Sequence, residues 1–124
     1  MKDAYSNVKA VAAIVPAVKT AAGDGATIDA QGFRSLLFVV NTGAVVGDGD
    51  FGIAIQESAN GTDWSAATDV LGEFPATLEA DSAYRVAYVG SQRYARINVT
   101  KAGGTSIALG AVAILGQPHM APVA

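Results

Sequence analysis

The stretch FGIAIQESANGTDW, residues 51–64, decides the fold. From Phe51 to Ile55 large apolar residues alternate with Gly and Ala, which is the period of a strand that buries one face. Asn60-Gly61 follows, and both residues tolerate positive φ, so the pair predicts a type I′ turn. The sequence therefore predicts a β-hairpin here, with Trp64 placed just past the turn to close one end of the core.

Segments on both sides of this hairpin have the same character. SLLFVVN at residues 35–41 is apolar and too short for a typical helix. Residues 84–88 and 94–99 alternate with period two, and SIALGAVAIL at residues 106–115 is apolar on both faces, so we place it as a central or covered strand. Val8–Val15 predicts the first strand, which Pro16 limits to a sheet edge or a break.

The pattern predicts an all-β protein with about eight short strands and turns roughly every 8–12 residues. We expect one β-sandwich of jelly-roll or immunoglobulin-like topology over residues 8–115, with an N-terminal arm at residues 1–7 and an extended C-terminal arm at residues 116–124. The predicted core consists of strand residues that point inward: Phe38, Val40, Ile53, Ile55, Trp64, Val86, Tyr88, Ile97, Val99 and Leu109.

The composition favours assembly with other proteins. Of the 124 residues, 51% are hydrophobic and only 15% are charged, against roughly 25% charged in an average soluble domain. A chain with so little charge either buries much of its surface or covers it with a partner. The net charge of −3 argues against nucleic acid, which binds clustered basic residues. No apolar run approaches the roughly 20 residues of a membrane span, so we expect no membrane partner.

The candidate chemical sites are weak. GDGDFG at residues 47–52 matches G-x-G-x-x-G, but a strand pattern follows it and its aspartates would repel phosphate. Asp48 and Asp50 supply two carboxylates, whereas Ca²⁺ takes roughly six to eight oxygen ligands. There is no cysteine, so thiol chemistry is excluded, and His119 as the only histidine cannot build the usual zinc site. We expect no enzyme activity, no cofactor and no metal.

Two groups of residues leave alternatives open. Acidic residues gather in the stretch after the hairpin, where they form either a hydrated rim or a surface that steers a basic partner: Asp63, Asp69, Glu73, Glu79 and Asp81. Trp64, Tyr84, Tyr88 and Tyr94 belong either to the core and its edge or to a sugar-stacking platform.

Four stretches together resemble a family of small proteins encoded in tailed bacteriophages and prophages near the major capsid gene. They are TIDAQGFRSLLFVV (27–40), IQESANGTDW (55–64), AYRVAYVGSQRYARINVT (83–100) and SIALGAVAILGQPH (106–119). The resemblance implies a non-enzymatic head decoration, or cement, protein. Such a protein is made in the host cytoplasm, and in the virion it binds and stabilises the shell of major capsid protein, alongside other copies of itself.

Two other classes stay open beside this one: a neck, head–tail connector or tail component, and a carbohydrate-binding module. For partner contact we expect the C-terminal arm and one loop to serve. The candidate contact residues are Pro118, His119, Met120, Pro122, Val123, Asp48 and Asp50.

Overall fold

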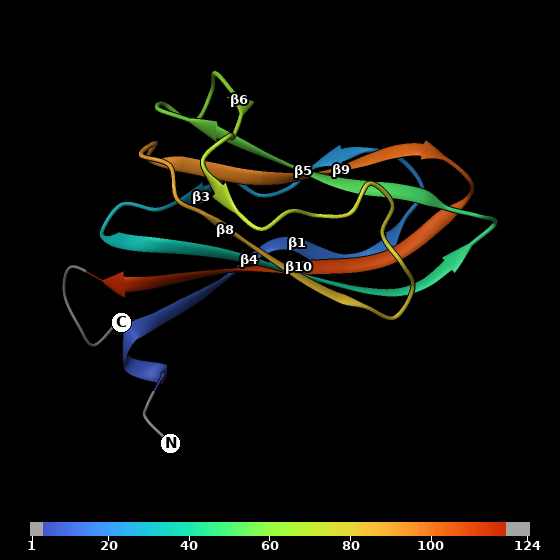
Figure 1. Ribbon diagram of the computed structural model, residues 1–124, viewed down its shortest axis with the longest axis horizontal. Helices are drawn as coiled ribbons and strands as arrows, with labels where there is room; N and C mark the ends of the chain where they lie inside the picture. The colour runs from blue at the N-terminus through green and yellow to red at the C-terminus, as the bar shows by residue number, and fades with distance from the viewer. Residues whose placement is uncertain (1–3, 119–124) are drawn as a thin grey trace.

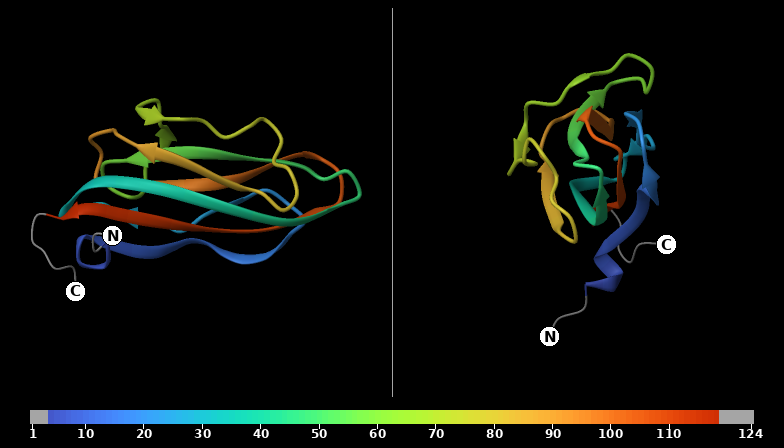
Figure 2. Two further views of the ribbon diagram at one scale, coloured as in Figure 1. Left: turned by 60° about the horizontal axis from the view of Figure 1, so that its bottom comes forward. Right: turned by 90° about the vertical axis from the view of Figure 1, so that its right-hand side faces the viewer.

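The computed structural model describes residues 4–118 as two antiparallel β-sheets packed face to face (Figure 1). Sheet A has the strand order β1-β10-β4-β8-β7, and sheet B has the order β2-β9-β5-β6, with β3 also paired to β9. The predicted all-β sandwich is confirmed. Figure 2 shows β1, β4 and β10 running side by side along the length of the molecule.

The long strands lie at the centre of each sheet and very short strands lie at most of the edges. Sheet A consists of β1 (Val8–Lys19), β4 (Phe33–Val46), β7 (Val70–Leu71), β8 (Ala83–Tyr88) and β10 (Ser106–Pro118). Sheet B consists of β2 (Gly23–Asp24), β3 (Ile28–Asp29), β5 (Asp50–Ser58), β6 (Ser65–Ala66) and β9 (Tyr94–Gly103). A 3-10 turn, η1 (Tyr5–Asn7), precedes β1.

Strand β10 occupies the middle of sheet A, between β1 and β4, as its two apolar faces indicated. It runs on through Pro118, which pairs with Phe33, so the strand extends three residues into the segment expected to be an arm. Strand β1 is an edge strand whose register shifts on both sides of Ile14, in agreement with the break expected at Pro16.

The hairpin at Asn60-Gly61 differs from its prediction. Of the two residues only Gly61 has positive φ, so the turn is not type I′. The Asn60 side-chain oxygen accepts hydrogen bonds from the backbone N–H groups of Thr62 and Asp63, at 2.8 and 2.9 Å. This side-chain turn replaces the backbone turn, and the chain returns only as the two-residue strand β6, opposite Gln56 and Glu57.

The core fills the space between the sheets. Phe38 and Val40 from sheet A meet Phe51 and Ile97 from sheet B, and all four side chains are fully buried. Among the remaining predicted core residues, Val86, Tyr88, Val99 and Leu109 are buried, whereas Ile53 and Ile55 are half-buried against the cluster. Trp64 lies outside the core, because the wide loop before β6 carries it to the outer face of sheet B.

Two segments close the sides of the sandwich. On one side Gly25 N donates to the Ile97 carbonyl and Ala26 N donates to the Ala13 carbonyl, both at 2.8 Å, so this segment joins β9 of sheet B to β1 of sheet A. On the other side buried Leu78 donates its N–H to the Phe51 carbonyl at 2.8 Å. This second segment contains four of the five residues of the acidic stretch, and all four are exposed: Asp69, Glu73, Glu79 and Asp81.

Candidate interaction surface

The outer face of sheet A, which points away from the core, carries small and aliphatic side chains in two rows across four strands. The register places these residues opposite one another because side chains alternate along each strand. One row is Ala10, Ile114, Leu37 and Ala87, and the next is Ala12, Val112, Val39 and Arg85. We call the six apolar residues on β1, β10 and β4 in these rows the aliphatic face.

A groove of about 690 Å³ lies beside these rows, lined by Pro16, Val18, Val39, Gly43, Ala108 and Val112 among others. Glycine is required at its floor: a Cβ at position 110 would lie 2.8 Å from Cγ of Pro16, so the proline ring rests where a side chain would otherwise stand. The walls are exposed, with Val18 at 66% and Val112 at 40%. The groove is therefore an open, apolar continuation of the aliphatic face.

Charge is almost absent from this surface. In the two rows Arg85 is the one charged residue, and it lies on β8, outside the aliphatic face. The centres of protein interfaces are depleted of charged residues, because burying an unpaired charge costs free energy. A partner could cover the aliphatic face without desolvating any charge of this protein.

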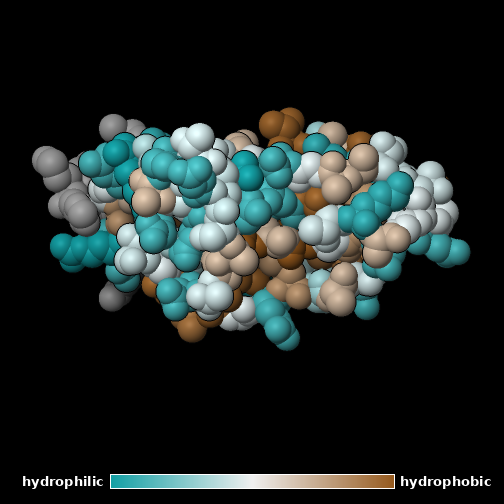
Figure 3. Space-filling view, turned by 90° about the horizontal axis from the view of Figure 1, so that it is seen from above, coloured by the Kyte–Doolittle hydropathy of each residue, from teal (hydrophilic) through white to brown (hydrophobic). Residues whose placement is uncertain are grey.

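The outer face of sheet B differs in character, and Figure 3 looks onto this side, where hydrophilic residues lie among near-neutral and apolar ones. Arg96 Nε donates to Gln56 Oε1 at 2.9 Å, and another guanidinium nitrogen lies 3.6 Å from the Asp24 carboxylate. The guanidinium also lies 4.2 Å from the centre of the Trp64 ring. The Arg96 and Gln56 side chains on this face therefore have polar partners within the protein.

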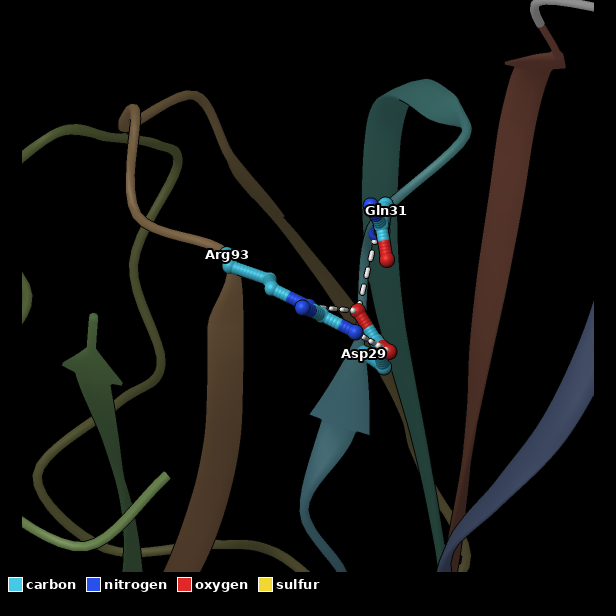
Figure 4. Close-up of polar contacts among 3 residues, drawn as sticks. All are labelled: Asp29, Gln31 and Arg93. Atoms are coloured by element: carbon cyan, nitrogen blue, oxygen red, sulfur yellow. Dashed lines mark hydrogen bonds and ion pairs between the residues drawn. The ribbon is translucent and has the colours of Figure 1, made fainter. Parts of the chain in front are cut away.

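One end of the sandwich is fixed by an ion pair (Figure 4). Arg93 donates from Nε and from a terminal guanidinium nitrogen to the two carboxylate oxygens of Asp29, at 3.0 and 2.8 Å. Gln31 N donates to the same carboxylate at 3.0 Å. The hydrogen bond from Arg93 holds the pKa of Asp29 below its usual value of 3.8. The pair links β3 to the start of β9 and presents no reactive group.

Trp64, Tyr84 and Tyr88 do not form one platform. Trp64 lies on the outer side of sheet B, with the Arg96 guanidinium over its ring. Tyr88 is buried in the core, where its hydroxyl donates to Glu57 Oε2 of the other sheet at 2.9 Å, and burial raises its pKa to about 12. Tyr84 is packed against the core, and its hydroxyl accepts from Glu79 N. A sugar could not stack on these rings together.

Of the predicted contact residues, Asp48 and Asp50 lie apart from the aliphatic face. Asp48 is exposed in the turn after β4, and Asp50 accepts a hydrogen bond from the Thr77 hydroxyl at 2.7 Å. Pro118 ends β10, while His119, Met120, Pro122 and Val123 lie outside the described residues. Sequence reasoning missed the aliphatic face itself, although the apolar runs at 35–41 and 106–115 carried its signal.

Two further observations concern residues 4–118. No three His, Cys, Asp or Glu residues gather there in a way that could hold a metal ion. None of the helical structure in this range has the length and apolarity needed to cross a membrane.

Solved structures contain this fold, although no protein-family model and no curated protein sequence matches the chain significantly. The SPBc2 prophage-derived protein YomS aligns over 88% of this chain and 92% of its own, with 13% identity and a TM-score of 0.61. The PBSX exported protein XepA aligns over 90% of this chain but only 38% of its own, with 17% identity and a TM-score of 0.63. What they share is the fold.

Proposed function

We propose that the protein is a non-catalytic structural component of a tailed-phage particle, and specifically a decoration protein that binds the shell of major capsid protein. The observation that carries this proposal is the aliphatic face, an uncharged apolar surface on the outside of a complete sandwich. Covering this surface with a partner is favourable, because exposed apolar area costs free energy in water.

The size of the face fits a decoration protein that acts in many copies. Three strands at roughly 4.8 Å spacing are ~14 Å across, and the two rows take up ~13 Å along them, so the aliphatic face covers about 190 Å². A standard interface buries about 800 Å² per partner, so one copy alone is a modest binder. Many copies on one shell, each adding a modest contact, give a stable whole.

Two observations support a phage setting for this protein. YomS is a prophage-derived protein by name and XepA is an exported protein by name, and the chain shares their fold over most of its length. The ordered motifs at residues 27–119 resemble a family encoded beside capsid genes. The assignment to the head, rather than to the neck or tail, rests on that resemblance and on the need to cover a flat apolar face.

The test is rebinding to phage heads from which this protein has been stripped. The native protein is expected to rebind stoichiometrically and to raise the heat resistance of the heads. Val112→Glu places a charge at the centre of the aliphatic face on a residue that is already 40% exposed. It should fold normally and lose affinity by roughly tenfold or more, since a buried unpaired charge costs over 1.4 kcal/mol.

Thr100→Glu is the matched control, because Thr100 is exposed on β9 of the opposite sheet. This variant should rebind like the native protein. Native protein that neither binds heads nor stabilises them would refute the decoration role. Equal rebinding of Val112→Glu would show that another surface makes the contact. Labelled antibody on intact particles separates the head from the neck, since a shell-wide label and a single-vertex label are mutually exclusive.

A further inference from the structure

One long strand edge of the sandwich is open. Strand β1 has 12 residues and pairs with β10 on one side only, whereas the strands at the other sheet edges, β2, β3, β6 and β7, have two residues each. Strand β6 pairs with only two residues of β5, but the Phe51 and Ile55 carbonyls of β5 accept hydrogen bonds from Leu78 N and Ala67 N. An edge strand presents unpaired backbone N–H and C=O groups, which are a template for another strand. A two-residue edge strand offers little of this template, whereas the 12-residue β1 offers a long one.

The open part of β1 can be delimited. Val8–Ala12 pairs with β10 in an unbroken register, from Val8 opposite Gly116 to Ala12 opposite Val112. Beyond it the edge is occupied, because the Ala13 carbonyl accepts the hydrogen bond from Ala26 N. The register then shifts and Pro16, which has no N–H, follows. Within residues 4–118, no second strand pairs with Val8–Ala12, and the midpoint of this stretch is Ala10.

The surface around this edge is apolar. Val8, Val15 and Val18 are all exposed, the last two by 71% and 66%. Lys9 is the only charged residue between positions 8 and 18. One lysine on a long edge is weak protection against pairing with another strand.

We propose that two copies of this chain pair through β1, antiparallel about a two-fold axis at Ala10. Five residues of each copy then pair: Ala10 faces Ala10 of the second copy, Val8 faces Ala12, and Lys9 faces Val11. A two-fold contact requires a surface complementary to itself, and this register meets that requirement because neither lysine opposes a like charge. Sheet A continues from one copy into the next.

This pairing goes beyond the decoration role and would double its surface. A two-fold axis perpendicular to the sheet keeps the outer faces of both copies on the same side. Ala10 and Ala12 lie on the strand that pairs, so the two aliphatic faces join without a gap. Five residue pairs make a small contact, below the roughly 1,200 Å² of stable interfaces, so the dimer should dissociate readily in dilute solution.

The absence of cysteine from the chain permits a clean cross-linking test. In the proposed register, Cα atoms of Ala10 in the two copies are ~4.5–5.5 Å apart, within the range of a disulfide. Under mild oxidation Ala10→Cys should form a covalent dimer roughly tenfold faster than a control, as expected for two thiols held together. The control is Ala54→Cys, an exposed alanine on β5 between Phe51 and Ile55, whose carbonyls already accept hydrogen bonds from Leu78 N and Ala67 N.

The register is tested by a mixture. Val8→Cys and Ala12→Cys should each remain monomeric alone, since like positions would be ~13 Å apart in the dimer, and should form a mixed disulfide together. Equal cross-linking rates of Ala10→Cys and Ala54→Cys, with native circular dichroism spectra for both, would overturn the pairing. Self-linking of Val8→Cys without mixed linking would overturn the register. The assay contains no phage heads, so its failure is separate from a failure of the decoration role.

Discussion

Replacing Gly25 with alanine is expected to be among the most damaging small changes in this protein. Gly25 lies between β2 and β3 of sheet B, in the segment that hydrogen-bonds to both sheets. A Cβ built there would overlap the Ile97 carbonyl oxygen and lie 2.8 Å from the Ala13 carbonyl oxygen. Both obstacles are backbone atoms, so no side chain can rotate to make room.

The cost follows from the hydrogen bonds that the same carbonyls accept. The Ile97 carbonyl accepts a hydrogen bond from Gly25 N, and the Ala13 carbonyl accepts one from Ala26 N. Moving residues 25 and 26 away to make room for a Cβ therefore breaks the two bonds that join the sheets on this side. A buried backbone group left without a partner costs about 1–3 kcal/mol. We therefore expect Gly25→Ala to lower the free energy of unfolding by about 3–5 kcal/mol, out of the 5–15 kcal/mol typical of a domain.

The measurement is urea denaturation followed by circular dichroism and by the fluorescence of Trp64, the only tryptophan. Gly23→Ala is the matched control, because no atom lies within 4 Å of a Cβ at that position, two residues away in the same segment. It should be neutral or more stable by up to about 1 kcal/mol. A Gly25→Ala protein within 1 kcal/mol of the native one, or equal losses in both variants, would refute this reasoning.

Two further predictions concern titration. Because the pKa of Tyr88 is raised to about 12 from 10, the folded protein holds a proton that the unfolded chain releases, and stability should fall between pH 10 and 12. In Tyr88→Phe the decrease in unfolding free energy between pH 10 and 12 should be smaller by up to about 2–3 kcal/mol. An equally steep decrease in the variant would contradict this prediction. Arg93 holds the pKa of Asp29 down. The stability that this ion pair contributes is therefore present above about pH 4 and is lost as the pH decreases through the pKa of Asp29 in the folded protein. In Arg93→Ala a carboxyl titration by NMR should find that pKa raised toward 3.8, and an unchanged value would show that Arg93 is not the cause.

The strands could be predicted from sequence because alternation and apolar runs depend on local order alone. Pro16 marked β1 as an edge, and the two apolar faces of residues 106–115 marked β10 as central, as the structure has them. The hairpin turn could not be predicted in detail, since Asn60 uses its side chain rather than its backbone to turn the chain. Trp64 was misplaced for the same reason, because its position follows from the width of that loop.

The aliphatic face could not be recognised from sequence for a different reason. An apolar strand face is equally consistent with a covering layer and with exposure, and only the three-dimensional arrangement decides between them. Val39 and Val112 are as apolar as Val40 and Ala113, yet the latter pair points into the core and the former points out. The inter-sheet contacts of Gly25 were equally hidden, since they join residues far apart in the chain.

The central position of β10 has a consequence for synthesis. Strands β1 and β4 leave the ribosome first, but neither touches the other in sheet A until residues 106–118 arrive to lie between them. Contacts between such distant parts of a chain form slowly and late. Val112 and Ile114, which complete the aliphatic face, are delivered by this same strand. A translation product cut short before residue 106 lacks the strand that joins β1 to β4, so it can neither complete sheet A nor display the aliphatic face.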